Sequence, residues 1–212
     1  MTEYHKIQTV FKRDMNTKHK TLLYGAYSMP EFEYLARNLW VFTEKVDGTN
    51  IRVIWDAGSK SLVFGGKTDN AQIPAKLYEK LSLMFTEEDM ERVFPDTSVC
   101  LYGEGYGAKI QKGGGNYRQD QSFVLFDVKI DRWWLERHNV IAIAETLGID
   151  VVPIIGNGTL FDMVEMVKKG FDSQWGAFDA EGIVARPAVE LIARNGQRII
   201  TKIKHRDFGG KP

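Results

Sequence analysis

The segment 122–130 constrains the fold of this chain most strongly, because its composition is that of a strand inside a sheet. Residues 123–130 are apolar apart from Asp127 and Lys129. Their β-branched and aromatic character, over a length typical of strands, favours this interpretation. A polar side chain in such a strand needs a partner, because burial removes its hydration. We therefore expect an interior strand in which Asp127 and Lys129 each contact a partner elsewhere in the protein.

Other short runs rich in β-branched and aromatic residues predict further strands. They lie at residues 39–42, 51–55, 61–64, 98–102 and 181–186. The dipeptide Asn195-Gly196 is the strongest short hairpin signal, so a hairpin is expected between strands at residues 189–194 and 197–205. The polar, basic stretch 12–20 predicts an exposed loop.

Helices are predicted between the strands from start and stop signals. Pro30 stands at a helix start, and Thr86 is an N-cap with Asp89 three residues later. Gly148 and Gly170 stand at helix C-termini. The helices expected on this basis cover residues 30–37, 74–85, 86–93, 135–147 and 161–169. Without a repeat or a linker-like tract, the pattern predicts a single α+β domain over residues 1–212, with antiparallel sheets flanked by helices.

Composition excludes several classes of protein. The 28 basic residues balance the 28 acidic ones, so any site for a polyanion must be a local patch. Cys100 is the single cysteine, which excludes an internal disulfide framework and a cysteine-rich zinc site. Residues 1–14 are polar, and no apolar run reaches the roughly 18 residues of a membrane span. We expect a soluble, cytoplasmic protein without a membrane partner.

Lys45 is the first candidate for chemistry. It follows the apolar run 39–42 and precedes Asp47 and Gly48. A lysine beside a carboxylate and a flexible glycine suits a nucleophile at the mouth of a pocket. Asp-Gly is equally a common hairpin turn, so the stretch by itself leaves both interpretations open.

Two glycine-rich stretches follow. Glu104 lies among three glycines at positions 103, 105 and 107, where a tight turn is the simplest interpretation. The segment 109–118 combines a glycine run with cations and an aromatic ring. Such a loop can wrap a phosphate backbone, and a mobile surface loop is the alternative. Its candidate nucleic-acid contacts are Lys109, Lys112, Tyr117 and Arg118.

Two strands near the C-terminus carry the remaining charged candidates. Strand alternation puts Glu181, Ile183 and Ala185 on one face. Lys202 and Lys204 lie two residues apart in the final strand, so their side chains must point the same way.

Taken in order, these residues resemble the motifs of the covalent nucleotidyltransferase superfamily, which comprises ATP-dependent polynucleotide ligases and mRNA capping enzymes. Residues 44–50 (EKVDGTN) resemble the nucleophile motif Lys-x-Asp-Gly, and residues 101–105 (LYGEG) resemble the third motif. Residues 123–127 (FVLFD) look like the adenine-stacking strand, 181–186 (EGIVAR) like the fourth motif and 201–204 (TKIK) like the fifth. Five motifs in the family's order imply a nucleotidyltransferase, or adenylation, domain.

Within that superfamily the resemblance is closest to the short, often phage-encoded RNA ligases of the RNA ligase 2 type. The nucleophile motif, the strand end 65–68 (GGKT) and the ending 202–207 (KIKHRD) carry it. RNA ligases often have arginine where Lys67 stands, and lysine lacks the bidentate fork of arginine. The chain ends soon after the fifth motif, so we expect no OB-fold or other C-terminal domain.

The resemblance implies an ATP-dependent RNA ligase that joins 3′-OH and 5′-phosphate ends through a lysyl-AMP intermediate and an adenylated 5′ end. Lys45 is then the nucleophile on the α-phosphorus of ATP, and Lys202 and Lys204 neutralise phosphate charge. The implied catalytic residues are Lys45, Glu104, Glu181, Lys202 and Lys204. The implied nucleotide contacts are Glu44, Val46, Asn50, Arg52, Lys67, Glu104, Phe126, Glu181, Lys202 and Lys204, with Phe126 stacking on adenine. The implied ligands of Mg²⁺ or Mn²⁺ are Asp47, Glu104 and Glu181.

Alternative functions stay open at this point. A minimal ATP-dependent DNA ligase that seals nicks is the first, because contacts to a 2′-OH cannot be located in a sequence. A guanylyltransferase is disfavoured by the missing C-terminal domain. A non-catalytic nucleic-acid-binding module of the same fold is disfavoured by the balanced charge and by retention of the lysine and both glutamates. We expect a monomeric enzyme whose partners are ATP and RNA.

Overall fold

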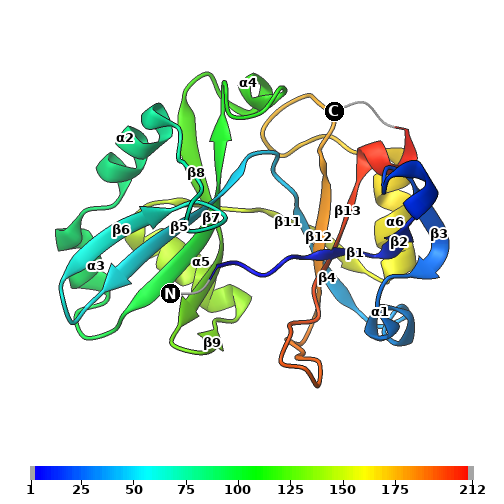
Figure 1. Ribbon diagram of the computed structural model, residues 1–212, viewed down its shortest axis with the longest axis horizontal. Helices are drawn as coiled ribbons and strands as arrows, with labels where there is room; N and C mark the ends of the chain where they lie inside the picture. The colour runs from blue at the N-terminus through cyan, green and yellow to red at the C-terminus, as the bar shows by residue number, and fades with distance from the viewer. Residues whose placement is uncertain (1–2, 210–212) are drawn as a thin grey trace. The chain divides into compact units, whose positions relative to one another are not determined.

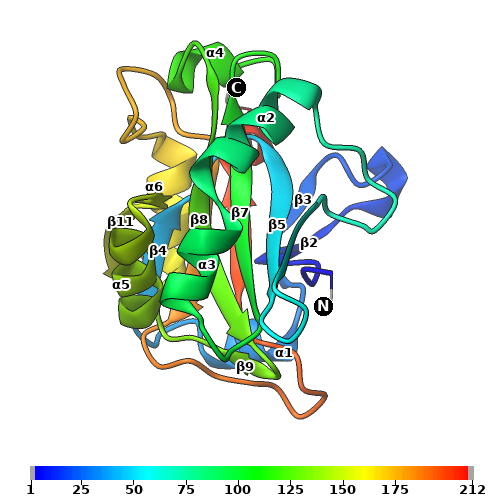
Figure 2. The ribbon, with the colours of Figure 1, turned by 90° about the vertical axis from the view of Figure 1, so that its left-hand side faces the viewer.

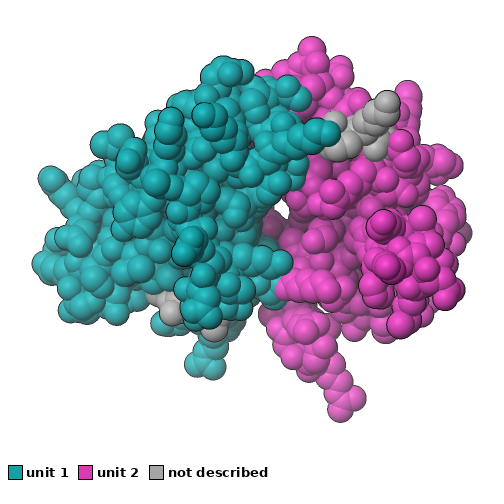
Figure 3. All heavy atoms as spheres, turned by 45° about the horizontal axis from the view of Figure 1, so that its top comes forward, with its two compact units in different colours: residues 1–5, 47–152 teal, residues 6–46, 153–212 magenta. Residues whose placement is uncertain are grey.

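The structure is a computed structural model that describes residues 3–209. The chain forms two compact units, which Figure 3 shows in separate colours. Unit 1 comprises residues 3–5 and 47–152, and unit 2 comprises residues 6–46 and 153–209. Each unit has a hydrophobic core of its own. The expectation of a single domain over the whole chain stays a prediction.

Unit 1 is built on a sheet in which the strands follow the order β10-β8-β7-β5-β6, with β9 paired to β8 (Figure 1). The pairings are antiparallel except for the parallel pair of β8 and β10. The predicted interior strand is β8, which has neighbours on both sides. The bounds are β5 (Thr49–Asp56), β6 (Ser61–Gly65), β7 (Val99–Gly107), β8 (Gln121–Ile130), β9 (Trp133–Trp134) and β10 (Asp150–Val151).

The helices of unit 1 are α2 (Ala75–Met84), α3 (Glu87–Val93), α4 (Gly114–Tyr117) and α5 (Arg137–Leu147). Three of them, α2, α3 and α5, bury apolar side chains against the same face of the sheet (Figure 2). The predicted end signals are confirmed. The hydroxyl of Thr86 accepts a hydrogen bond from the backbone N–H of Asp89, and Gly148 ends α5 with φ +65°.

Unit 2 contains a second sheet with the strand order β1-β13-β12-β4-β11, and a separate pair formed by β2 and β3. The strands are β1 (Gln8–Thr9), β2 (Phe11–Arg13), β3 (Leu22–Tyr27), β4 (Trp40–Glu44), β11 (Ile154–Gly158), β12 (Gly182–Pro187) and β13 (Thr201–Lys204). The helical segments are the 3₁₀ turns η1 (Met15–Thr17) and η2 (His205–Phe208) and the helices α1 (Pro30–Tyr34) and α6 (Leu160–Lys169). None of the helices in residues 3–209 is long and apolar enough to cross a membrane.

The core of unit 2 fixes which way its strands face. Helix α6 begins at a capping box between Thr159 and Asp162 and buries its apolar side against the sheet. Ile183 on β12 and Ile203 on β13 are paired in register and are both fully buried in that core. Because side chains alternate along a strand, the residues on either side of Ile203 point to the opposite face.

The predicted C-terminal hairpin is right in its turn, and its second strand contains β13, but its first strand and the pairing of the two are wrong. Gly196 has φ +81°, and the N–H of Ala193 donates to the carbonyl of Gln197 at 2.7 Å. Beyond this turn a single bridge joins Ile192 to Arg198, and residues 189–194 form no strand. The reason is that β13 pairs with β12 on one side and with β1 on the other, so both of its edges are occupied. The expected loop at residues 12–20 also begins within strand β2.

The glycines around Glu104 do not form a tight turn, which corrects that interpretation. Strand β7 continues through them to Gly107 and stays paired with β8. A Cβ at Gly103 would lie 2.2 Å from the Phe123 ring, and one at Gly105 would lie 2.4 Å from Leu77. Glycine is required at these positions because neighbouring groups approach the backbone closely.

An aromatic cluster supplies the partners expected for the polar residues of β8. The hydroxyl of Tyr4 donates to the carboxylate of Asp127 at 2.5 Å. The ammonium of Lys129 lies 5.3 Å from the ring centre of Trp134. The Tyr4 ring in turn meets the Phe126 ring edge-on at 5.0 Å. The expectation that Asp127 and Lys129 have partners is thereby confirmed.

Replacing Gly103 by alanine is expected to destabilise unit 1 by about 1–3 kcal/mol, the usual range for overpacking a core. The added Cβ would lie 2.4 Å from the carbonyl oxygen of Val124, besides its clash with the Phe123 ring. Urea unfolding followed by tryptophan fluorescence measures the change. Gly113→Ala is the matched control, since the nearest atom to its Cβ would be 3.9 Å away. Equal unfolding midpoints for the two variants would contradict the close approach of β7 and β8.

Candidate active site

A carboxylate held between two lysines forms the charged centre of unit 2. Lys45 follows the last residue of β4, and its backbone N–H donates to the carbonyl of Gly182 at 2.9 Å. Its Nζ lies 2.5 Å from Oε2 of Glu181, and the Nζ of Lys204 lies 2.5 Å from Oε1 of the same residue. We call this group the Lys45–Glu181–Lys204 cluster. It brings together three of the predicted catalytic residues.

The cluster determines the ionisation of Glu181. Burial of the carboxylate favours its neutral form, but the charges of Lys45 and Lys204 and their hydrogen bonds outweigh this and hold the pKa of Glu181 below its usual value. Glu181 is therefore ionised at neutral pH, and two ammonium groups share one negative charge. The cluster carries a net positive charge suited to an anionic ligand.

Gly182 explains how Glu181 reaches the lysines. Its φ of +157° is strained for other residues, and a Cβ there would lie 2.1 Å from the carbonyl oxygen of Ile203. Ile183 and Ala185 share one face, as predicted, and that face is buried in the core, but Glu181, which was expected on the same face, instead meets Lys204. Lys202 pairs in register with Val184 and lies on the same face as Lys204.

Glu44, directly before the lysine, is buried with both carboxylate oxygens engaged. The hydroxyl of Ser173 donates to Oε1 at 2.6 Å, and the backbone N–H of Gln174 donates to Oε2 at 2.8 Å. Burial raises the pKa of Glu44, although these two hydrogen bonds oppose the rise. Val46, on the other side of Lys45, is also buried. Sequence reasoning missed Ser173 because it lies in an irregular segment without a periodic pattern.

The Asp47-Gly48 pair is not a hairpin turn, because β4 and β5 belong to different sheets. Within unit 1, a Cβ at Gly48 would lie 2.8 Å from Cγ of Glu104. Asn50 pairs in register with Glu104 across β5 and β7. The N–H of Asp47 donates to the hydroxyl of Tyr117 at 3.2 Å. The structure therefore brings Gly48, Asn50 and Glu104 together at one end of the unit 1 sheet.

Arg52 and Asn50 each hold a buried polar atom without a protein partner in residues 3–209. These atoms are Nη1 of Arg52 and Oδ1 of Asn50. The rest of the guanidinium is used, since Nε donates to Gly66 at 2.9 Å and Nη2 lies 2.8 Å from Asp69. Lys67 lies between these partners in the chain and is exposed. Unsatisfied buried polar atoms are rare in folded proteins and are compatible with an absent ligand.

The predicted nucleic-acid loop divides into engaged and exposed residues. The ring of Tyr117 is 9% exposed, and Arg118 forms a bidentate pair with Asp120 at 2.5 and 2.9 Å. Lys109 and Lys112 are exposed, and their side chains have no hydrogen bond or ion pair in the described part of the chain. Tyr117 and Arg118 are therefore engaged in contacts within unit 1.

Comparison with known proteins decides the family. A family model described as RNA ligase matches residues 38–204. The chain belongs to the RNA ligase family. That match spans all five motifs, from Glu44 to Lys204, so the resemblance seen in the sequence is confirmed at the level of the family. No curated protein sequence matches the chain.

Solved structures of an RNA ligase from Naegleria gruberi share the fold of this RNA ligase family member. An apo variant has a TM-score of 0.68 at 16% identity, over 99% of this chain and 59% of that one. A variant with ATP and manganese has a TM-score of 0.69 at 16% identity, over 96% of this chain and 56% of that one. A form with pyrophosphate has a TM-score of 0.67 at 18% identity, over 96% of this chain and 58% of that one. This chain spans less than two thirds of their length. The predicted α+β nucleotidyltransferase fold is confirmed.

The three predicted metal ligands differ in how well their surroundings fit a bound divalent ion. Among residues 3–209, no group of three or more histidine, cysteine, aspartate or glutamate side chains could hold a metal. Both oxygens of Glu181 already face an ammonium at 2.5 Å, so direct metal coordination by Glu181 does not fit this arrangement. Mg²⁺ usually keeps several waters and takes one or two carboxylates. Asp47 and Glu104 remain compatible with such a site.

Replacing Glu181 by glutamine is expected to destabilise the protein by about 1.5–3 kcal/mol at neutral pH, the range for hydrogen bonds to charged groups. The pKa of Glu181 is lowered by folding, so the cluster stabilises fully above the ordinary glutamate pKa of about 4.3 and loses this as pH falls through the lower, folded value. The wild-type advantage in unfolding free energy should therefore be constant above about pH 5 and shrink below about pH 4.

Urea unfolding at several pH values measures this difference. Glu145→Gln is the matched control, since Glu145 is exposed on α5 and makes no ion pair in the described part of the chain. A wild-type advantage over Glu181→Gln that grows as the pH falls would contradict the assigned ionisation.

Proposed function

We propose that this chain is an ATP-dependent RNA ligase that joins 3′-OH and 5′-phosphate ends through a lysyl-AMP intermediate and an adenylated 5′ end. The Lys45–Glu181–Lys204 cluster, in a chain of the RNA ligase family, is the observation that carries the proposal. The Naegleria RNA ligase structures that contain ATP and manganese support ATP and a divalent ion as the requirements of this enzyme.

In the first step Nζ of Lys45 forms a bond to the α-phosphorus of ATP, and the bond from that phosphorus to the bridging oxygen breaks to release pyrophosphate. The nucleophile must be neutral, whereas an ion pair favours an ammonium. Lys204 shares the same carboxylate at 2.5 Å, which limits how strongly Glu181 holds the proton on Lys45. Glu181 thus orients Nζ, and Lys45, whose side chain is 18% exposed, gives its proton to solvent water before the neutral amine attacks.

The other proposed catalytic residues of unit 2 act by electrostatic stabilisation. Lys202 and Lys204 neutralise the negative charge that builds on the α-phosphate during in-line displacement. The same two cations serve when AMP passes to a 5′-phosphate and when the 3′-OH displaces AMP to form the new phosphodiester. A divalent ion, when bound, supplies further neutralisation of phosphate charge as a Lewis acid, and Asp47 and Glu104 are the residues that would hold it.

The nucleotide contacts form the second part of the proposal. The orphaned atoms of Asn50 and Arg52 supply one acceptor and one donor for a bound nucleotide. Phe126 offers a ring for the adenine base. Glu44 and Val46 flank the nucleophile in sequence and complete the set, together with Lys67. Since lysine is a point charge without the fork of arginine, Lys67 would meet a phosphate through single contacts.

Self-adenylylation tests the proposal. With α-labelled ATP and Mg²⁺ or Mn²⁺, the wild-type chain is expected to carry label that stays with the denatured protein on an SDS gel, because the P–N bond of a lysyl phosphoramidate is covalent. That label should survive alkali and be released by acid, as a phosphoramidate requires. Lys45→Arg is expected to show none, since arginine keeps the charge that pairs with Glu181 but is not a nucleophile. Lys169→Ala, at an exposed position of α6, should label like the wild type. An unlabelled wild type, or equal label on Lys45→Arg, would contradict a lysyl-AMP intermediate.

Strand joining tests the nucleic acid. The purified chain is expected to join 3′-OH and 5′-phosphate ends on RNA faster than at an all-DNA nick, because it belongs to the RNA ligase family. Denaturing gel electrophoresis of end-labelled strands measures both rates. Faster joining of the DNA nick would favour the minimal DNA ligase, and nucleic-acid binding without label or joining would favour a non-catalytic module.

A further inference from the structure

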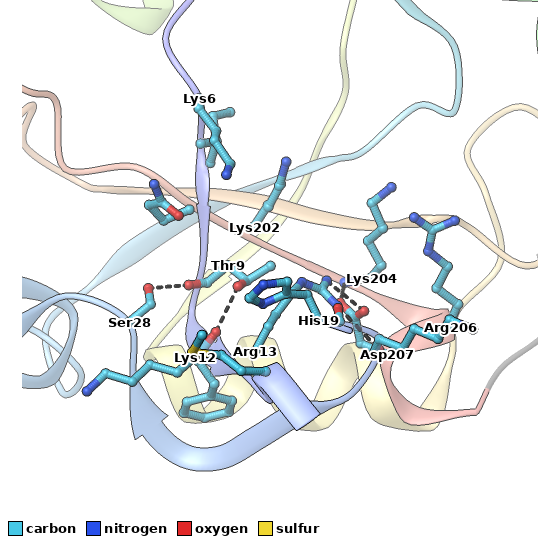
Figure 4. Close-up of a pocket in the computed structure, with 15 residues that line it drawn as sticks. Lys6, Thr9, Lys12, Arg13, His19, Ser28, Lys202, Lys204, Arg206 and Asp207 are labelled. Carbon is cyan, nitrogen blue, oxygen red and sulfur yellow. Dashed lines mark hydrogen bonds and ion pairs between the residues drawn. The ribbon is translucent and has the colours of Figure 1, made fainter. Parts of the chain in front are cut away.

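A basic cavity of about 970 Å³ lies within unit 2 (Figure 4). The residues that line it come from the N-terminal segment 6–20, from Ser28 and from the end of the chain at 202–207. Seven of them carry a lysine or arginine side chain, namely Lys6, Lys12, Arg13, Lys20, Lys202, Lys204 and Arg206. This concentration stands out in a chain whose formal net charge is zero.

The positive charge of the basic cavity is not neutralised from within. Asp207 is the acidic residue of its lining, and its side chain is 2% exposed. One oxygen of Asp207 lies 2.8 Å from Arg13, and the other accepts from the backbone N–H of Lys204 at 3.1 Å. Lys6, Lys20 and Arg206 are exposed, and within residues 3–209 their side chains take part in no hydrogen bond or ion pair.

The backbone holds these cations in place. Strand β1 runs parallel to β13, with Gln8 opposite Thr201 and Thr9 opposite Lys202. The Arg13–Asp207 ion pair joins β2 to η2. Figure 4 shows the charged ends of Lys6, Lys202, Lys204 and Arg206 along one side of the cavity, whereas Lys12 points away from them. Of these four, Lys202 and Lys204 lie on β13, whereas Lys6 precedes β1 and Arg206 lies in η2.

We propose that the basic cavity binds the phosphodiester backbone of an RNA strand and so holds that strand next to the Lys45–Glu181–Lys204 cluster. The inference rests on the proposed function and names where unit 2 takes its nucleic-acid substrate. A row of cations over a cavity of this size matches a chain of phosphates, since single-strand binders use positively charged grooves that follow the backbone. Lys204 belongs to both sites, which links the bound strand to the reacting phosphate.

A nucleoside triphosphate is the competing ligand, because its phosphates carry the same kind of negative charge as an RNA backbone. A pyrophosphate group is compact and is satisfied by a few converging donors. The cations of the basic cavity are instead distributed over the segment before β1, strand β2, the loop after η1, strand β13 and η2, and most of them lie outside the Lys45–Glu181–Lys204 cluster. The distribution favours the extended ligand.

The salt dependence of RNA binding tests the proposal. Fluorescence anisotropy of a labelled oligouridylate, without ATP, is measured for the wild type, for the triple variant Lys6→Gln/Lys20→Gln/Arg206→Gln and for Lys169→Gln. Each lost phosphate contact reduces the slope of log K against log [salt] by about 0.7, so the triple variant is expected to lose about 2. When the salt is raised from about 50 to about 200 mM, the factor by which the variant loses affinity is then about 20 times smaller than the factor for the wild type. Lys169→Gln, outside the cavity, should keep the wild-type slope.

Self-adenylylation of the same proteins, without RNA, separates the possible failures. An unchanged slope in the triple variant would overturn the proposed RNA site. A triple variant that binds RNA like the wild type but takes up less label from ATP would assign the cavity to the triphosphate and also overturn it. A wild type that takes up no label would refute the proposed ligase function, while a reduced slope would still support an RNA-binding cavity. Thermal melting of each variant verifies that it is folded.

Discussion

One carboxylate shared by two lysines is the interaction on which the rest of unit 2 depends. Lys45, Glu181 and Lys204 come from three segments far apart in the sequence, and both contacts of Glu181 are 2.5 Å long. Compared with apolar residues of the same volume, such an ion cluster adds little net stability, because desolvation of the charges offsets their attraction, although removing one of its members is costly. Its role is to fix the position of the Lys45 side chain. A lysine tethered to a fixed carboxylate presents its nitrogen in one direction, which is what attack on a phosphorus requires.

The hydrophobic core determines where that carboxylate and its lysines can be. Ile183 and Ile203 are buried against α6, and this fixes the register of β12 against β13. With Ile203 inward, Lys202 and Lys204 must lie on the other face, where both line the basic cavity and Lys204 reaches Glu181. A shift of one residue would exchange the lysines with the core. Packing of an apolar face therefore sets the charge pattern of the opposite face.

Glycines let polar groups approach the backbone in both units. Gly182 allows Glu181 to turn towards the lysines, because only glycine fits beside the carbonyl of Ile203. Gly48 lies against Glu104 in unit 1 for the same steric reason. At Gly103 the requirement is a packed ring rather than a turn. The glycines of the motifs thus allow close contact with the backbone, whereas the sequence pattern predicted flexible or turn positions there.

The sequence by itself determined the main helices, most of the longer strands and the family, but not strands such as β3 and β11. Signals that act over a few residues, such as the Thr86 cap, the Gly148 C-cap and the apolar run of β8, were enough for this, because capping and alternation are local. Only the tertiary structure decided what those signals could not reach. Ser173 holds Glu44, and Tyr4 holds Asp127, across more than a hundred residues of chain. The strand expected at residues 189–194 failed because β13 had closer partners in β12 and β1. Such choices depend on which distant segments compete for an edge or a buried charge, and a local pattern carries no information about that competition.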